Sequence, residues 1–144
     1  MTHILFYEKP GCGGNAKQKS LLQRSGHTLT VRDLLTETWT DATLMTYLAP
    51  LPVADWFNRA APKVRDGLID PATLDADTAL AMLLKEPLLI RRPLMSFSGT
   101  QGEEYFVGFE AEKLAEKIYL EGVTPAANKA ENLEACPRQA KQID

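Results

Sequence analysis

The 144-residue sequence predicts one α/β domain in which strands and helices alternate. Three observations support this class. The apolar run ILFY at 4–7 ends at a proline and a glycine-rich turn, as a buried strand does. The stretch 16–25 contains no glycine or proline, and Gly26 follows it as a natural helix stop. Two apolar runs, at 88–97 and 104–109, flank a turn and predict a hairpin.

The N-terminal elements are expected to be a strand, a helix and a second strand. TLTVRDL at 28–34 alternates apolar and polar residues imperfectly, and we interpret it as the second strand. A strand, helix and strand in this order predict two parallel strands joined by a right-handed crossover.

The middle of the chain, at about 40–86, predicts a helical insertion. Three apolar stripes at helical spacing are each followed by a proline that ends the helix. The stripes are Leu44, Tyr47 and Leu48; Val53, Trp56, Phe57 and Ala60; and Leu80, Leu83 and Leu84, with Asp75 or Asp77 as the cap of the third. We expect Trp56 and Phe57 in the hydrophobic core rather than at a binding surface.

The elements after the insertion complete the domain. LLIRRPLMSF at 88–97 is apolar on both sides of an Arg-Arg-Pro break, SGTQGEE at 98–104 predicts a turn, and EYFVGF at 104–109 predicts the returning strand. A last helix carries Ala111, Leu114, Ala115 and Ile118 and ends at Gly122. The domain is therefore expected at 1–122, with the polar segment 123–144 as a flexible tail.

The composition argues against several function classes. A net charge of −3 gives no electrostatic footprint for nucleic acid or an anionic membrane. No apolar run approaches the ~20 residues of a membrane span, and the N-terminus lacks signal-peptide features, so we expect a cytoplasmic protein. His3 and His27 have no partner at metal-ligand spacing, so we expect them at the surface, with no bound metal or cofactor.

Cys12 is the candidate reactive residue. If the first helix begins near Gly13, Cys12 is its N-cap and lies at the positive end of the helix dipole, which favours the thiolate. Gly13 and Gly14 would let backbone N–H groups converge on an anion beside the sulfur. Lys9 and Lys17 add positive charge nearby, whereas Glu8 opposes it. The alternative is that Cys12 is a small inert residue in a glycine turn, and these residues alone leave both open.

The spacing of the two cysteines defines what a redox cycle at Cys12 would require. Position 15 is Asn15, so Cys12 is not part of a C-x-x-C dithiol. Reduction of an oxidised Cys12 would therefore need an external thiol or a distant resolving cysteine. Cys136 is interpreted as a tail thiol without a role, with a resolving function as the alternative.

Three segments together resemble a known family. YEKPGCGGNAKQKSLL, WFNRAAP and LLIRRPLMSFSG…VGFEAEKLAE are similar, in order and over about residues 1–120, to the thioredoxin-fold arsenate reductases that couple to glutathione and glutaredoxin. Within that family the sequence resembles most the nitrogenase-associated protein subfamily. The resemblance implies a thioredoxin-like mixed sheet with a helical insertion.

The resemblance also implies roles for individual residues. Cys12 would be the nucleophile that later accepts glutathione, and Arg59 and Arg92 would hold the anion, for which a guanidinium is a planar fork of donors. Pro93 would follow a cis peptide bond beside the cysteine. Asn15 would join the glycine loop in binding the anion, whereas Arg91 is expected to face solvent.

Departures from the family pattern concern the substrate. The family's third arginine, in the hairpin, is replaced at about Gly108, and 98–109 contains no arginine or lysine. Glu8 stands where the family has a histidine, and Asn15 where it has a serine. Two guanidinium groups match a multiply charged oxyanion less well than three. We therefore expect an anionic or thiol substrate other than arsenate.

Two functions remain open from the sequence. The first is a glutathione- and glutaredoxin-linked thiol oxidoreductase, monomeric, with glutathione as co-substrate and a protein partner in nitrogen fixation. The second is a non-catalytic thioredoxin-like binding module or redox-responsive regulator that docks on another protein. The missing third arginine and Glu8 favour the second, whereas the combination of Cys12, Arg59 and Arg92 favours the first.

Overall fold

The computed structural model describes residues 2–99 and 102–125 of the chain. Its strands are β1 (His3–Glu8), β2 (Thr28–Asp33), β3 (Leu94–Gly99) and β4 (Gly102–Val107). Its α-helices are α1 (Gly13–Arg24), α2 (Asp41–Leu48), α3 (Pro62–Arg65), α4 (Ala76–Lys85) and α5 (Ala111–Leu114). Three short 3-10 helices are η1 (Val53–Trp56), η2 (Pro71–Thr73) and η3 (Pro87–Leu89).

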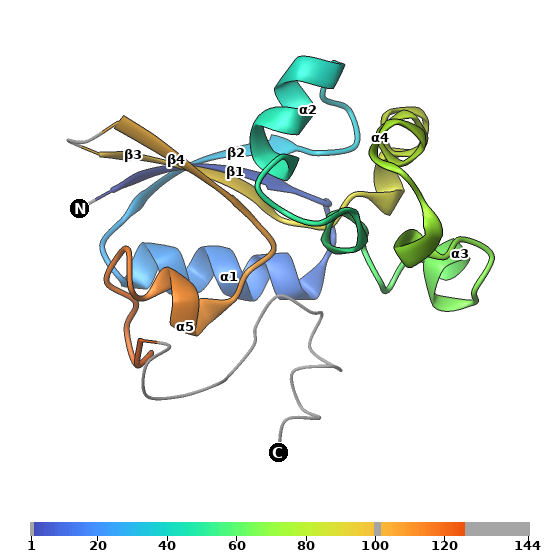
Figure 1. Cartoon of the computed structure of the whole chain (residues 1–144). Coiled ribbons are helices and arrows are strands. Elements are labelled where there is room, and N and C mark those ends of the chain that lie inside the picture. Colours follow the sequence, from blue (N-terminus) through green and yellow to red (C-terminus); the bar gives the residue numbers. More distant parts are fainter. Residues whose placement is uncertain (1, 100–101, 126–144) are drawn as a thin grey trace.

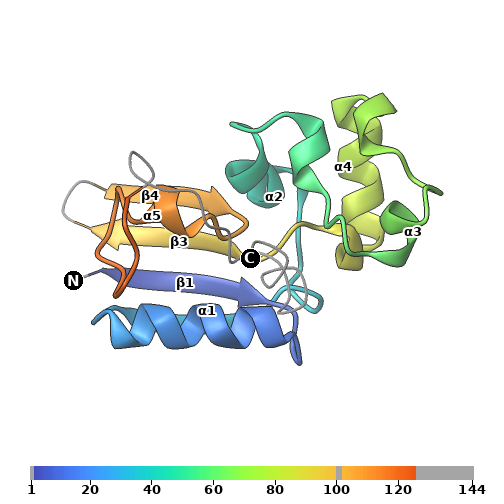
Figure 2. The same ribbon diagram turned by 90° about the horizontal axis from the view of Figure 1, so that it is seen from below.

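The four strands form one mixed sheet in the order β2-β1-β3-β4. β1 and β2 are parallel and joined through α1, whereas β3 is antiparallel to both β1 and β4. Helices α1 and α5 cover one face of the sheet, α2 lies over the other, and α3 and α4 extend beyond one end (Figures 1 and 2). The predicted thioredoxin-like mixed sheet with a helical insertion is confirmed.

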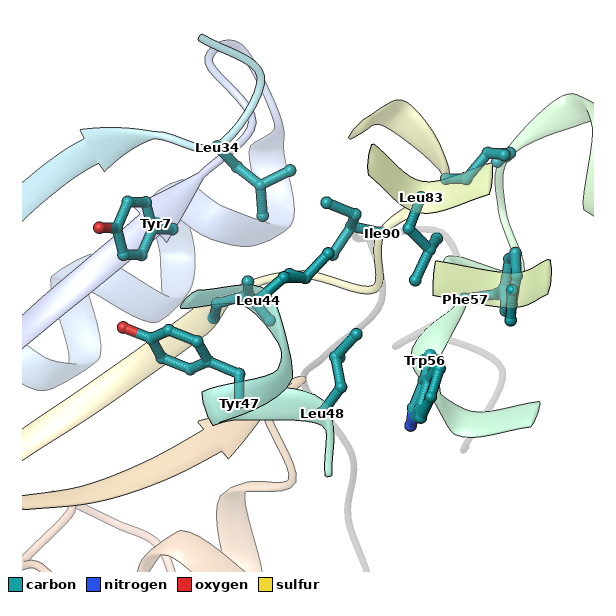
Figure 3. Packing of buried hydrophobic residues seen from close by; sticks show 13 residues of the cluster. Tyr7, Leu34, Leu44, Tyr47, Leu48, Trp56, Phe57, Leu83 and Ile90 are labelled. Carbon is teal, nitrogen blue, oxygen red and sulfur yellow. The ribbon is translucent and has the colours of Figure 1, made fainter. Parts of the chain in front are cut away.

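Alternation along the strands creates two hydrophobic clusters. Ile4 and Phe6 of β1 are fully buried with residues of α1 and α5 on one face. Tyr7 points to the opposite face and joins the cluster that holds the insertion. There Leu48 of α2 and Leu83 of α4, both in the insertion, belong to one cluster with Ile90 (Figure 3). Each Å² of apolar surface that is removed from water stabilises the fold by about 25 cal/mol. Burial in this cluster therefore ties the insertion to the sheet.

The second predicted stripe of the insertion is only partly helical. Trp56 ends η1, and Phe57 is extended, with φ −100° and ψ 145°. Phe57 forms an antiparallel bridge with Ile90, and the N–H of Asn58 donates to the Leu89 carbonyl at 2.8 Å. The prediction of one helix through Ala60 was wrong, because this long-range pairing replaces helical hydrogen bonds. Trp56 and Phe57 are buried in the core, as predicted.

Three smaller expectations also need correction. The last helix ends at Leu114, and turns and irregular structure replace the helix predicted as far as Gly122. The returning strand begins at Gly102, within the predicted turn. His27 is not a surface residue: it is 7% exposed, accepts from the N–H of Thr2 at 3.2 Å and contacts the Tyr119 carbonyl at 2.8 Å. These two backbone partners satisfy an imidazole that sequence spacing shows as isolated.

The predicted flexible tail lies largely outside the described residues. Residues 126–144, including Cys136, are among those that the structure does not describe, so the two interpretations of Cys136 stay predictions. Within the described ranges, no helix is both long and apolar enough to cross a membrane.

Candidate functional site

A tight turn places Cys12 at the start of α1. The Cys12 N–H donates to the Lys9 carbonyl at 3.1 Å, with Pro10 and Gly11 between them. Gly11 has φ +83°, which glycine adopts without steric cost and which suits the third position of a type II turn. Cys12 is the N-cap of α1, has φ −76° and ψ 119°, and is half-buried. The sequence prediction for its local position is therefore correct.

The first turn of α1 provides backbone donors beside Cys12. The first helical hydrogen bond runs from the N–H of Ala16 to the Cys12 carbonyl at 3.1 Å. The N–H groups of Gly13, Gly14 and Asn15 precede it and have no acceptor within the helix. Together with the helix dipole, these groups favour a thiolate over a thiol at the N-cap. Gly13 is exposed and Gly14 is buried, so the two glycines differ in access to solvent.

The side chain of Asn15 has a structural role that the sequence analysis did not predict. It is 1% exposed, and its Oδ1 accepts from the Lys9 N–H at 3.0 Å. Its Nδ2 donates to the Oε1 of Gln18 at 2.9 Å. The oxygen of the amide therefore holds the turn to α1, and its nitrogen is tied to Gln18 within the same helix. Asn15 therefore positions the loop of Cys12, and its part in binding an anion stays a prediction.

Glu8 is compensated by a lysine on α1. Its Oε1 pairs with the Nζ of Lys19, and both side chains are mostly buried. We expected the Glu8 carboxylate to oppose a thiolate at Cys12. The ion pair weakens that opposition, because Lys19 supplies the opposite charge at contact distance.

The Arg-Arg-Pro segment lies beside the end of β1. Leu94 is opposite Tyr7 in the antiparallel register, so Pro93 precedes the first residue of β3 at the edge where β1 ends and the Cys12 turn begins. The Arg92–Pro93 peptide bond is cis, the isomer that the resemblance implied. Arg92 is half-buried, and among the described residues it has no ion-pair partner. The register thus brings Arg92 and the Cys12 turn to one edge of the sheet.

Arg59 lies farther out, on the insertion. Its side chain is 74% exposed and pairs with the Asp55 carboxylate at 3.2 Å. It also borders a surface pocket of about 280 Å³ that is lined by Ala54, Arg59, Val64, Asp70, Pro71 and Ala72. Cys12 and Arg92 are not among the lining residues, so this pocket alone does not unite the three predicted site residues.

Arg91 is the residue that the sequence interpretation missed. Its side chain is 14% exposed, contrary to the expected solvent-facing position. Nη1 donates to the Asp55 carbonyl at 3.3 Å, and Nη2 donates to Glu110 Oε2 at 3.2 Å. A Cβ added at Gly108 would lie 2.6 Å from its Nε, so only glycine leaves room for the guanidinium. The available signal was the change to Gly108 itself, at the position where the resemblance implied another arginine.

Glu110 is shared between two cations. Lys113 Nζ lies 2.9 Å from Glu110 Oε1, opposite the oxygen that Arg91 uses. Burial raises the pKa of Glu110, but the hydrogen bond and charge of Lys113 and the charge of Arg91 outweigh it, so the net shift is downward. Glu110 therefore remains a carboxylate at neutral pH. Within the described ranges, no group of three or more His, Cys, Asp or Glu residues is arranged to hold a metal ion.

Comparison with known proteins identifies a family. No family model matches the chain. The chain is 41% identical over 140 residues to the uncharacterized 15.7 kDa protein in the draG 3' region of Rhodospirillum rubrum. The aligned residues cover 97% of this chain and 92% of that protein. The chain belongs to the family of that protein. Its members thus include a protein known by its gene's position beside draG.

Solved structures that are similar to this fold include two proteins whose names relate them to arsenate reductase. An ArsC-family-related protein from Bacteroides fragilis has a TM-score of 0.64 and 24% identity, over 80% of this chain and 97% of that one. An ArsC-related protein from Brucella melitensis has a TM-score of 0.58 and 23% identity, over 79% and 92%. At these identities the likeness shows the fold alone.

Proposed function

We propose that this chain is a glutathione- and glutaredoxin-linked thiol oxidoreductase with Cys12 as its nucleophile. The observation that carries the proposal is the placement of Cys12 at the N-terminus of the twelve-residue helix α1, at the sheet edge where Arg92 and Pro93 also lie. The fold shared with ArsC-related proteins supports a thiol chemistry of this class. Arg92 would hold an anionic group of the substrate, and Arg59 would contribute from the insertion.

The proposed step is a thiol–disulfide exchange. The Cys12 thiolate attacks one sulfur of glutathione disulfide, forms a mixed disulfide and releases glutathione thiolate. A glutaredoxin dithiol then attacks the mixed disulfide, which returns Cys12 to its reduced form and releases the second glutathione. Glutaredoxin becomes oxidised by two electrons, so the exchange balances. Access from solvent and thiolate character favour the first step. Cys12 is half-buried and lies at the N-cap of α1, a position that favours the thiolate.

The test uses a Cys136→Ser background, so that Cys12 is the one thiol that reacts. The rate of alkylation by iodoacetamide against pH gives the Cys12 pKa, which we expect below the ~8.5 of a free cysteine. Intact mass after exposure to glutathione disulfide should show one glutathione adduct that glutaredoxin removes. Arg92→Ala should raise the Cys12 pKa, whereas the matched change Arg32→Ala, at an exposed arginine on the edge strand β2, should not. A pKa at or above ~8.5 with no adduct would refute the proposal.

A second candidate function is a non-catalytic, redox-responsive binding module. One observation favours it: Arg59 and Arg91 are each paired with an acidic residue of the chain itself. In this case Cys12 would still take up glutathione, but the adduct would change binding of a protein partner. Binding that is equal for the reduced and glutathionylated forms would exclude this candidate.

We further propose that the protein acts with a partner in nitrogen fixation. The resemblance to the nitrogenase-associated subfamily supports this, as does the draG 3' region in the relative's name. The source organism should then raise the level of this protein when it fixes nitrogen. Equal levels with and without ammonium would contradict the association.

A further inference from the structure

The chain after α5 is fixed to the far end of the helix that begins at Cys12. The Glu121 N–H donates to the Ser25 Oγ at 2.9 Å, and the Glu121 carboxylate pairs with Arg24 at 3.0 Å. Figure 1 shows this segment on the same side of the sheet as α1. The residues that follow Glu121 therefore start beside the C-terminal end of α1, on the face of the sheet that α1 covers.

The distance from this anchor to Cys12 is well within the reach of the remaining chain. α1 has 12 residues, and at about 1.5 Å per residue its two ends are about 18 Å apart. Cys136 follows Glu121 by 15 positions. A chain of that length spans up to roughly 50 Å when it is extended, and as a random coil it has a root-mean-square span of roughly 20 Å. The second value matches the length of α1, which is the condition under which two tethered groups meet most often.

The charges at the start of α1 complement the segment that contains the second cysteine. Lys9, Lys17 and Arg92 are at or near this end of the helix. None of the three has an ion-pair partner in the part of the chain that the structure describes. The segment 131–136, ENLEAC, contains two glutamates and no lysine or arginine. Opposite charge and the positive end of the helix dipole thus favour an approach of this segment to the start of α1.

We propose that Cys136 is the resolving cysteine of Cys12, with the segment 131–136 as the occupant of the surface beside the start of α1. The inference rests on the proposed function of Cys12 as a nucleophile. After Cys12 has taken up glutathione, the Cys136 thiolate attacks the Cys12 sulfur. A disulfide between Cys12 and Cys136 forms, the bond to glutathione breaks, and glutathione leaves as a thiolate that takes a proton from water. The number of disulfides is unchanged, so this step needs no further oxidant.

The internal disulfide separates the release of glutathione from the reduction of the protein. Glutathione leaves first, and a glutaredoxin dithiol then reduces the bond between Cys12 and Cys136 and becomes oxidised by two electrons. While this bond is closed, Cys12 cannot react with a second substrate molecule. The pair therefore keeps the site inactive until a dithiol reductant reaches it.

The test follows intact mass after glutathione disulfide is added to the unchanged full chain and to Cys136→Ser, at equal concentration and pH. In Cys136→Ser we expect one glutathione adduct that persists. In the unchanged chain the adduct should disappear about tenfold faster or more, because the attacking thiol is tethered. The product should be lighter than the reduced protein by two hydrogen atoms, and its peptide map should join Cys12 to Cys136. Dilution of the protein should not change the rate, because the two thiols belong to one chain.

A charge variant tests the approach of the segment separately. Glu134→Gln should slow the closing of the disulfide about twofold to threefold at low salt, because it removes one of the two negative charges of the segment. The matched control is Glu116→Gln, at an exposed position after α5, which changes the net charge equally and should leave the rate unchanged. Equal rates in Glu134→Gln and in the control would overturn the assignment of the segment to this surface.

The outcomes distinguish this inference from the proposed function. An adduct that lasts equally long in the unchanged chain and in Cys136→Ser would overturn the inference and leave the proposed exchange standing. A disulfide that joins two chains and forms faster at higher protein concentration would also overturn it.

A second oxidant completes the comparison, because diamide oxidises pairs of thiols without glutathione. If Cys136→Ser takes up no glutathione but diamide joins Cys12 to Cys136 in the unchanged chain, the proposed exchange fails and the internal pairing stands. If diamide gives no internal disulfide, the pairing is refuted.

Discussion

Substitution of Gly108 by alanine should destabilise the protein through Arg91. Gly108 has φ +78°, a conformation that costs an L-residue about 1–2 kcal/mol. The new Cβ would also lie 2.6 Å from Nε of Arg91 and 2.7 Å from Nη2. Because the guanidinium can move, the further cost is the loss of its bond to Glu110, about 1.5–3 kcal/mol for a charge-assisted hydrogen bond, less some solvent screening. We expect a total loss of about 2–4 kcal/mol.

Urea unfolding with a double-mutant cycle separates the two contributions. Gly67→Ala is the matched control, since Gly67 has φ +83° and a Cβ added there would meet nothing within 4 Å. It should cost only the backbone contribution of about 1–2 kcal/mol. In an Arg91→Ala background, Gly108→Ala should fall to the same value, which gives a coupling energy of about 1–2 kcal/mol. If Gly108→Ala costs no more than Gly67→Ala, or if Arg91→Ala brings no relief, the close approach of Arg91 to Gly108 is not what requires glycine.

Three further predictions follow from other contacts. Asn15→Ala should lower the free energy of unfolding by about 1–3 kcal/mol, because the Lys9 N–H loses its acceptor. The control is Gln23→Ala, at an exposed position of α1. A loss for Asn15→Ala no larger than for this control would contradict the prediction. Burial raises the pKa of Tyr47 to about 12. The stabilisation from its neutral side chain should therefore be fully present below pH 10 and decline as pH rises toward 12. In urea titrations, Tyr47→Phe should flatten that decline. The charges of Lys113 and Arg91 overcome burial and lower the pKa of Glu110. The stabilisation from Glu110 should therefore be present above its unfolded pKa near 4.5 and be lost as pH falls through the lower folded value. Glu110→Gln should remove this acid-limb loss, and an unchanged acid limb would contradict the assignment.

Local signals were sufficient to predict the elements near Cys12. The proline and glycines that end β1 and the uninterrupted stretch that forms α1 act over a few residues, so the sequence shows them directly. The stripe at 53–60 failed because helical spacing says nothing about a distant partner: Phe57 pairs with Ile90, 33 positions later. His27 was misplaced for the same reason, since both of its partners are backbone groups far along the chain.

The candidate site likewise combines features that the local sequence predicts with features that depend on distant contacts. The N-cap position of Cys12 follows from the turn sequence, and the cis bond before Pro93 accords with what the resemblance implied. Which of two adjacent arginines is held inside could not be read from the sequence. That choice depends on the space above Gly108 and on two acceptors, Asp55 and Glu110, which come from segments on either side in the chain.

The bridge between Phe57 and Ile90 has a mechanical consequence for the insertion. Two backbone hydrogen bonds flank it, from Asn58 to Leu89 at 2.8 Å and from Arg91 to Trp56 at 2.9 Å. The strand fragment that they hold continues directly into Arg92 and Pro93. The insertion is therefore mechanically coupled to the Arg-Arg-Pro segment, and a displacement of η1 would pull on Arg92 and Pro93. Any force on the insertion is thus carried by backbone hydrogen bonds to the end of the sheet where the Cys12 turn begins.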